Sequence, residues 1–139
     1  MPDGSCLCQS IKYQYKGEPI SSAVCHCQTC HKISSSSSVN VLVPHDHFRI
    51  TSGKDHLKEY NLTHESGMHM TTHFCSECGC VLYKTADRKD FQDDVIVLAG
   101  TLDDPNALDE IKPSAEFFVR ERASWWPALD GARQLGGFT

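Results

Sequence analysis

Apolar and polar residues alternate in several short stretches of this chain, and turn-forming residues separate the stretches. Residues 10–15 (SIKYQY) place Ile and Tyr at every second position, which is the period of a half-buried strand. Residues 37–44 (SSVNVLVP) also alternate, are rich in β-branched residues and end at a proline. Residues 94–102 (DVIVLAGTL) form the most apolar segment, so we expect a central strand there. A further strand is predicted for residues 115–122 (AEFFVRER), with its arginines on one face.

The middle of the chain shows the same short period. Residues 47–62 are expected to form short strands broken by the Ser-Gly turn at 52–53. Residues 69–85 are expected to form a strand, a cysteine-rich knuckle and a second strand. A helical start signal occurs in residues 104–111 (DPNALDEI), where Asp104 precedes a proline in the first-turn position. The pattern therefore predicts a mainly β protein with irregular antiparallel sheets.

Length and composition are those of one globular domain. The chain has 139 residues, of which 40% are hydrophobic and 22% are charged. It contains no internal repeat and no linker-like segment, and the serine run at Ser34–Ser38 is too short to separate two domains. We therefore expect residues 1–139 to form a single domain, with the serine run as an ordered loop beside the cysteines.

Charge and hydropathy exclude two classes of partner. The net charge is −5 with neutral histidines, and no run of basic residues exceeds two, which argues against nucleic-acid binding. No apolar run approaches the roughly 20 residues of a membrane span, and the N-terminus has no signal-peptide pattern. We expect a soluble, cytoplasmic protein that binds neither nucleic acid nor membranes.

The eight cysteines carry the strongest chemical signal, because they fall into three closely spaced groups. In a reducing compartment such spacing favours metal binding or catalysis over a disulfide framework, which stays open as the weaker alternative. Extended C-x-C pairs aim both sulfurs to one side, and C-x-x-C does so through a knuckle turn. The groups are Cys6-x-Cys8, Cys25-x-Cys27-x-x-Cys30 and Cys75-x-x-Cys78-x-Cys80.

These groups can be divided between two metal sites. A structural zinc takes four closed ligands, whereas a catalytic zinc keeps one position open. A closed structural site could be formed by two cysteine pairs from distant parts of the chain, Cys6 and Cys8 with Cys75 and Cys78. A catalytic site with one open position could be formed by the trio Cys25, Cys27 and Cys30.

A fourth ligand to the trio would instead make a second closed site. Cys80, His26 and His31 are the candidates for it. His26 lies between two ligands, so on a strand its ring points to the opposite face, and Cys80 is expected to be a small apolar residue rather than a ligand. The remaining histidines lie singly in polar stretches, where a solvated surface position is expected for His45, His47, His56, His64, His69 and His73.

Taken in order, the motifs resemble those of the glutathione-dependent formaldehyde-activating enzymes, the Gfa or CENP-V family, over essentially the whole chain. The segments that carry the resemblance are GSCLCQSIKYQ, VCHCQTCHKISSS, FCSECGCVLY, LAGTLDD and EFFVRERASWWPALDG. The resemblance implies an Mss4-like fold with two Zn²⁺ per chain. By position it implies a structural zinc on the first C-x-C and the later C-x-x-C, and a catalytic zinc on the trio. The chain departs from the usual family pattern at two places. Cys80 stands where family members often have Ser or Thr, and the segment HKISSSSS lacks the glycine that is often found there.

The resemblance also implies a carbon-sulfur lyase reaction, in which glutathione and formaldehyde combine to S-(hydroxymethyl)glutathione. An open zinc position suits this reaction because the metal lowers the pKa of an incoming thiol. Two alternatives remain, namely the same chemistry on another hemithioacetal or biosynthetic intermediate, and a zinc-stabilised binding module without turnover. The oligomeric state stays undetermined.

Glutathione is anionic, so basic and hydroxyl side chains are its candidate partners. The hydroxyl groups of Ser34–Ser38 could bind its peptide part, and Trp125 and Trp126 could cover the pocket or pack in the core. The basic candidates, each of which could equally be a solvated surface charge, are Lys12, Lys32, Arg49, Arg120 and Arg122.

Overall fold

The computed structural model describes residues 1–139 and contains two β-sheets. The smaller sheet has the order β1 (Asp3–Ser5), β2 (Lys12–Tyr15) and β5 (Phe48–Ser52). The larger sheet has the order β11 (Arg133–Gln134), β10 (Ala115–Phe117), β3 (Ser21–Cys25), β4 (Ser38–Pro44), β9 (Asp94–Leu98), β8 (Val81–Ala86), β7 (His69–Cys75) and β6 (Leu57–Thr63). The prediction of a mainly β protein with irregular sheets is confirmed.

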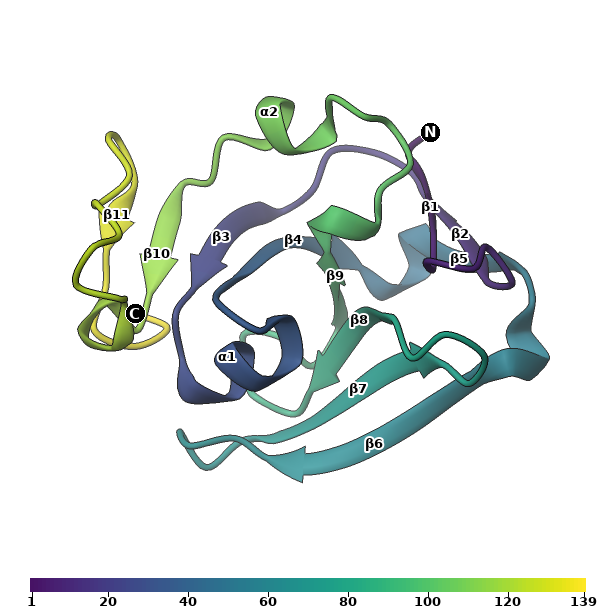
Figure 1. Ribbon diagram of the computed structural model, residues 1–139, viewed down its shortest axis with the longest axis horizontal. Coiled ribbons are helices and arrows are strands. Elements are labelled where there is room, and N and C mark those ends of the chain that lie inside the picture. Colours follow the sequence, from purple (N-terminus) through teal and green to yellow (C-terminus); the bar gives the residue numbers. More distant parts are fainter.

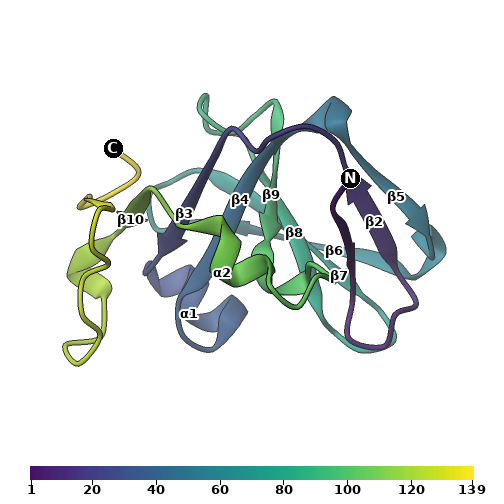
Figure 2. The ribbon, with the colours of Figure 1, turned by 90° about the horizontal axis from the view of Figure 1, so that it is seen from above.

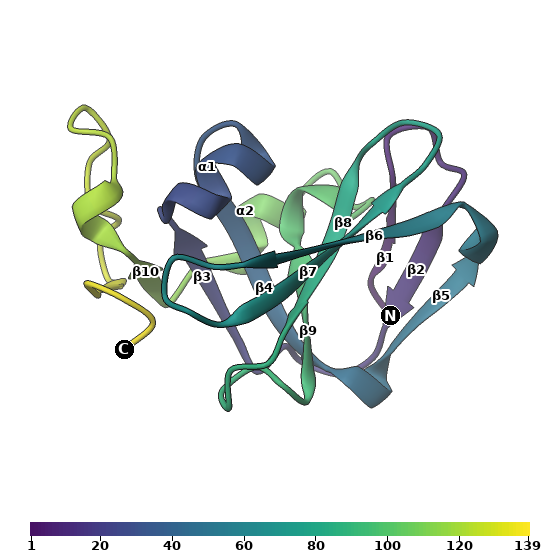
Figure 3. The same ribbon diagram turned by 90° about the horizontal axis from the view of Figure 1, so that it is seen from below.

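Along the longest axis of the molecule, the small sheet lies at one end and β10, β11 and the C-terminal segment lie at the other (Figures 1–3). The helices α1 (Gln28–Ser34) and α2 (Ala107–Ile111) connect strands of the large sheet. Short 3-10 turns span His45–His47, Lys54–His56, Ala99–Thr101 and Val119–Glu121. Neither α-helix has the length and apolar character that a membrane span requires.

The main core lies between the small sheet and the large one. Ile11, Tyr13 and Tyr15 are each at most 4% exposed, as their alternation predicts, and they pack against valines of β4 and β9. Burial of such side chains contributes roughly 1.5–3 kcal/mol each. β9 pairs with β4 on one side and β8 on the other, so the predicted central strand is confirmed.

The structure corrects the expected strand at residues 115–122. β10 ends at Phe117, and Phe118 has a φ of 55°, which turns the chain out of the sheet into a 3-10 turn. The two arginines therefore do not share a strand face. The sheet is also not wholly antiparallel, because β10 pairs in parallel with both β3 and β11.

The helices also differ from the expectation. α2 begins after Asn106, and the Asp104 carboxylate instead accepts a hydrogen bond from the Asn106 N–H at 2.9 Å in the preceding turn. α1 was not expected, because its seven residues lack an apolar period. α1 includes Ser34, the first residue of the serine run, and β4 begins at Ser38. The predicted serine loop is therefore limited to residues 35–37.

Candidate metal centres

One cysteine group joins the N-terminal segment to the knuckle after β7. The Sγ atoms of Cys6, Cys8, Cys75 and Cys78 all lie within 4.8 Å of one another. The Cys6–Cys8 and Cys8–Cys75 Sγ distances are 3.7 and 3.8 Å. A tetrahedron with Zn–S bonds of about 2.3 Å has S–S edges of roughly 3.8 Å, whereas a disulfide needs about 2.05 Å. The four-cysteine group therefore fits a closed tetrahedral metal site.

The backbone around this group is arranged to stabilise thiolates. The Ile11 N–H donates to Cys6 Sγ at 3.3 Å, and the Glu77 N–H donates to Cys75 Sγ at 3.3 Å. Gly79 has a φ of 76°, which lets the knuckle turn close directly after Cys78. Cys80 lies outside the four-cysteine group and packs against the main core.

The cysteine trio comes from one short segment at the junction of β3 and α1. Cys25 is the last residue of β3, and Cys27 is the N-cap of α1. The Cys30 N–H donates to Cys27 Sγ at 3.2 Å, the contact that a side chain makes from the N-cap to the third helical residue. Helix capping thus converts C-x-x-C spacing into two adjacent sulfurs. All three Sγ atoms lie within 4.8 Å of one another, and the three residues are at most 3% exposed.

Cys30 also receives contacts from outside this segment. Ser38 donates a hydroxyl hydrogen bond to Cys30 Sγ at 3.0 Å, and the Lys84 Nζ lies 3.7 Å from the same sulfur. The Sγ atoms of Cys25 and Cys27 hold the pKa of Cys30 well below its usual range, and Lys84 and Ser38 act in the same direction. A thiolate at Cys30 is therefore favoured.

Lys84 was not among the predicted site residues, although it is 3% exposed and has no carboxylate partner within salt-bridge distance. A buried ammonium without a counter-charge is costly, so its position beside a sulfur group that ionises is informative. The sequence around it (VLYKT) gave no signal of this, because the partner sulfur comes from 54 residues away.

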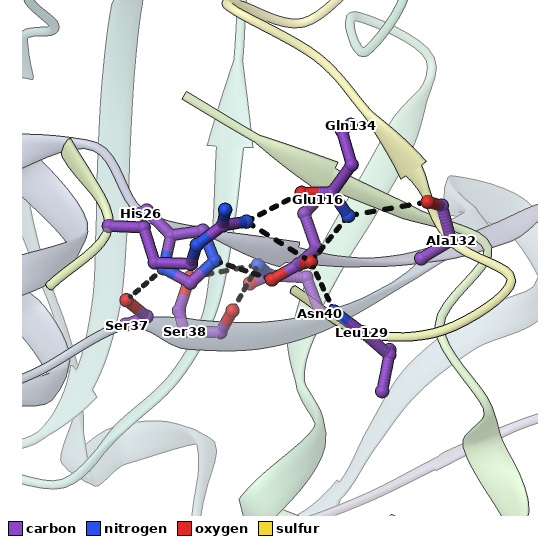
Figure 4. Close-up of polar contacts among 9 residues, drawn as sticks. His26, Ser37, Ser38, Asn40, Glu116, Leu129, Ala132 and Gln134 are labelled. Atoms are coloured by element: carbon purple, nitrogen blue, oxygen red, sulfur yellow. Dashed lines mark hydrogen bonds and ion pairs between the residues drawn. The ribbon is translucent and has the colours of Figure 1, made fainter. Parts of the chain in front are cut away.

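His26 does not join the trio, and its ring lies between Ser37 and Glu116 (Figure 4). Its Nδ1 lies 2.6 Å from the Ser37 hydroxyl and its Nε2 lies 2.7 Å from a Glu116 carboxylate oxygen. Both ring nitrogens are therefore engaged, which removes His26 as a fourth ligand. His31 and Cys80 do not join the trio either.

Glu116 anchors the C-terminal segment to this buried histidine. Its second carboxylate oxygen accepts hydrogen bonds from the Leu129 N–H at 2.8 Å and from Gln134, and Arg122 lies at 3.4 Å (Figure 4). Burial raises the pKa of Glu116, but the hydrogen bonds from Leu129, Gln134 and His26 outweigh it and hold that pKa below its usual range. The carboxylate thus stays charged although it is 1% exposed.

Two histidines expected at the surface are buried. His73 stacks on Tyr83 with a centroid distance of 4.2 Å, and His64 is 2% exposed beside the trio. A ring nitrogen of His64 lies within 4.8 Å of both Cys27 Sγ and the Glu65 carboxylate. The predicted surface positions were wrong because polar neighbours in the sequence do not show which distant segments bury a residue.

The hydrogen bonds of His64 define which ring nitrogen carries the proton. Its Nδ1 accepts from the Ser66 backbone N–H at 2.9 Å, so in the neutral ring Nε2 bears the hydrogen. This Nε2 is buried and, although 3.0 Å from Glu65, lies outside hydrogen-bond geometry. In this tautomer the Nε2 of His64 offers an N–H, paired only electrostatically with Glu65, rather than a lone pair for a metal.

A largely apolar cavity of about 50 Å³ borders the trio. Eleven of its 15 lining residues are hydrophobic, and the polar ones include His64, Lys84 and Asn40. None of the predicted glutathione-binding cations lines it. Those cations are Lys12, Lys32, Arg49, Arg120 and Arg122.

Of the two roles left open for the tryptophans, the structure does not show the pocket cover, because neither of them lines the cavity. Trp125 is 79% exposed, and the ring of Trp126 packs edge-on against the ring of His26 at a centroid distance of 5.4 Å. Phe138, which was not singled out from the sequence, lines the cavity instead. Of the serine run, Ser38 contacts Cys30 and Ser37 contacts His26.

Comparison with known proteins shows the family of the chain and a likeness of fold. The sequence model of the family described as glutathione-dependent formaldehyde-activating enzyme matches residues 1–121. A crystal structure of a Rhodobacter sphaeroides protein, solved as a structural genomics target, superposes with a TM-score of 0.60 at 19% identity, covering 78% of this chain and 96% of that one. At this identity the likeness concerns the fold. No curated protein sequence gave a significant match.

Proposed function

Because the chain belongs to the glutathione-dependent formaldehyde-activating enzyme family, we propose that it is a zinc-dependent carbon-sulfur lyase acting on thiol-aldehyde adducts. In the reaction after which the family is named, the adduct is S-(hydroxymethyl)glutathione. The observation that carries the proposal is the convergence of three buried cysteine sulfurs, a buried lysine and a histidine N–H on one small cavity.

The two cysteine groups would hold two zinc ions with different roles. Cys6, Cys8, Cys75 and Cys78 would hold a structural zinc, because four sulfurs at tetrahedral spacing leave no position for a substrate. Cys25, Cys27 and Cys30 would hold the second zinc with one position open. When bound there, zinc lowers the pKa of an incoming thiol and keeps it as a nucleophilic thiolate. Both groups lie on strands or turns of one fold, and we propose that residues 1–139 work as one domain.

Lys84 would balance the charge of the trio. Three thiolates and one divalent cation carry a single net negative charge, and the Lys84 ammonium lies 3.7 Å from Cys30 Sγ in a buried position. Ser38 supports the same sulfur, and Asn40 holds Ser38 by donating to its hydroxyl oxygen at 2.8 Å. These contacts orient Cys30 and partly neutralise the site, as outer partners of metal ligands do in other proteins.

His64 and Lys84 also face the place where negative charge develops. As the sulfur-carbon bond forms, the carbonyl π electrons move to oxygen, and the proton lost by the thiol finally resides on that oxygen. Donors on residues that already line the cavity stabilise this charge without reorganising. In the reverse direction the hydroxyl proton leaves, the sulfur-carbon bond breaks and the aldehyde is released. The apolar lining of the cavity would keep water out during both the forward and the reverse reaction.

The proposal is tested by exchange of ¹³C-formaldehyde into S-(hydroxymethyl)glutathione, followed by two-dimensional NMR against the spontaneous rate. We expect the zinc-loaded protein to contain two zinc ions and to accelerate exchange with glutathione or with a small thiol in its place, and Cys27→Ser to lose the acceleration together with one zinc. Cys80→Ser removes a thiol outside both groups and is the matched control. A fully zinc-loaded protein that leaves the spontaneous rate unchanged for glutathione and for small thiols would contradict lyase function.

A second version of the function keeps the chemistry and changes the substrate. The small size of the cavity favours it, because the cavity volume of about 50 Å³ is far below what a tripeptide fills. Exchange with small thiols in place of glutathione distinguishes the two versions.

A further inference from the structure

The C-terminal segment, residues 122–139, follows the residues that the family's sequence model matches, which end at residue 121. It is nevertheless fixed to the site. β11 pairs in parallel with β10, and the Glu116 carboxylate accepts hydrogen bonds from Leu129 and Gln134 (Figure 4). Since Glu116 also binds His26, between Cys25 and Cys27, the segment is connected to the backbone that carries the trio.

Phe138 brings this segment over the sulfurs. Its ring packs against the trio. It also packs against the neighbouring apolar cluster of Met68, Met70, Phe91 and Ile96, so it connects the two groups. Arg88 lies over the ring at 5.2 Å. The aromatic rings that surround Phe138 at centroid distances of 4.9–5.6 Å are Phe118, Phe91, His64 and Phe117. A ring held from this many sides is a defined wall of the cavity.

The volume left beneath Phe138 is small. Pockets that hold drug-sized ligands measure about 300–1,000 Å³, and one water needs roughly 10–15 Å³. The cavity of about 50 Å³ therefore has room for an aldehyde of two heavy atoms and a compact thiol, but not for a tripeptide. Larger surface hollows of about 730 and 1,000 Å³ exist, but no cysteine lines either of them.

We propose that Phe138 is a specificity-determining residue, which closes the cavity against glutathione and selects thiols with few atoms beyond their sulfur. The proposal rests on the proposed function, since it assumes that a thiol reaches the trio. It assigns the choice of thiol to the C-terminal segment, while residues 1–121, which the family's sequence model matches, supply the sulfurs, Lys84 and His64.

Thiol binding to the full-length protein loaded with Co²⁺ tests this without turnover. A sulfur that joins the trio changes the visible absorption of the cobalt there, whereas the four-cysteine site is already closed and does not respond. Under anaerobic conditions we expect 2-mercaptoethanol to bind the wild-type protein about tenfold more tightly than glutathione, and Phe138→Ala to remove most of this difference by strengthening glutathione binding. Binding of 2-mercaptoethanol should change less than about twofold.

Two variants serve as controls. Phe138→Leu keeps a smaller apolar wall and should lose only part of the preference, whereas Trp125→Ala removes an exposed ring of the same segment that does not line the cavity and should keep all of it. Equal binding of both thiols by the wild type, or the same preference in Phe138→Ala, would overturn the role of Phe138 and leave the lyase function standing. If neither thiol changes the spectrum of any variant, the proposed function fails and this inference fails with it.

Discussion

The two cysteine groups differ in how the fold builds them. The four-cysteine group draws on segments 67 residues apart, Cys8 in it is exposed, and its sulfurs already have tetrahedral spacing. The trio comes from six consecutive residues, is buried, and lies beside a cavity with a lysine and a histidine. A site that joins distant segments through all its ligands contributes to folding. A site that is local and lies beneath a cavity contributes little to folding but can accept a ligand.

Removing one ligand from each group should separate these contributions most clearly. Cys75→Ser breaks the group that joins the N-terminal segment to β7, and structural zinc binding is worth about 10–16 kcal/mol in small domains. We expect this variant to lose its cooperative thermal transition, whereas Cys27→Ser keeps a folded circular dichroism spectrum. If Cys27→Ser unfolds while Cys75→Ser stays folded, the two roles have been exchanged.

A smaller effect should follow from changing the charge beside the trio alone. Lys84→Met removes the ammonium next to Cys30 but keeps the apolar stem, so zinc at the trio should bind about 10–100-fold more weakly. Competition with a chromogenic chelator measures this, and the four-cysteine site should keep its affinity. Lys89→Met, at an exposed lysine close by in sequence, is the control. Equal zinc affinity in Lys84→Met and Lys89→Met would show that Lys84 does not balance the charge of the trio.

The smallest effect concerns the polar network behind the trio. Glu116→Gln replaces a carboxylate that accepts several hydrogen bonds, and the expected loss is about 1–3 kcal/mol of unfolding free energy at pH 7. The pKa of Glu116 is lowered in the folded protein, so its stabilising contribution is complete above the unfolded pKa of about 4.3 and is lost as the pH falls through the lower, folded pKa.

Urea unfolding of both zinc-loaded proteins between pH 7 and pH 4 measures this contribution as the difference between the two curves. The difference should be constant down to about pH 5 and then shrink. A difference that does not change with pH would mean that Glu116 is not held as a carboxylate.

Local features of the chain were predictable because they depend on neighbouring residues. The alternation at residues 10–15 placed Ile11, Tyr13 and Tyr15 in the core, and the C-x-C spacing predicted that His26 between the two cysteines does not join their sulfurs. The cysteine spacing predicted which sulfurs converge, because a C-x-x-C segment brings its ends together in both a knuckle and a capped helix turn. The same period failed at residues 118–122, where a left-handed residue ends the strand.

The sequence by itself determined the cysteine groups, the strand alternation and the family motifs, since each is written in residues a few positions apart. The tertiary structure alone decided what surrounds the trio. Three residues from elsewhere in the chain lie beside the trio, and no local pattern marks them. They are Lys84 on β8, His64 directly after β6, and Phe138 in the C-terminal segment. The physical reason is that burial and charge pairing depend on which distant segments pack together. The polar or apolar character of neighbouring residues in the chain does not predict this packing.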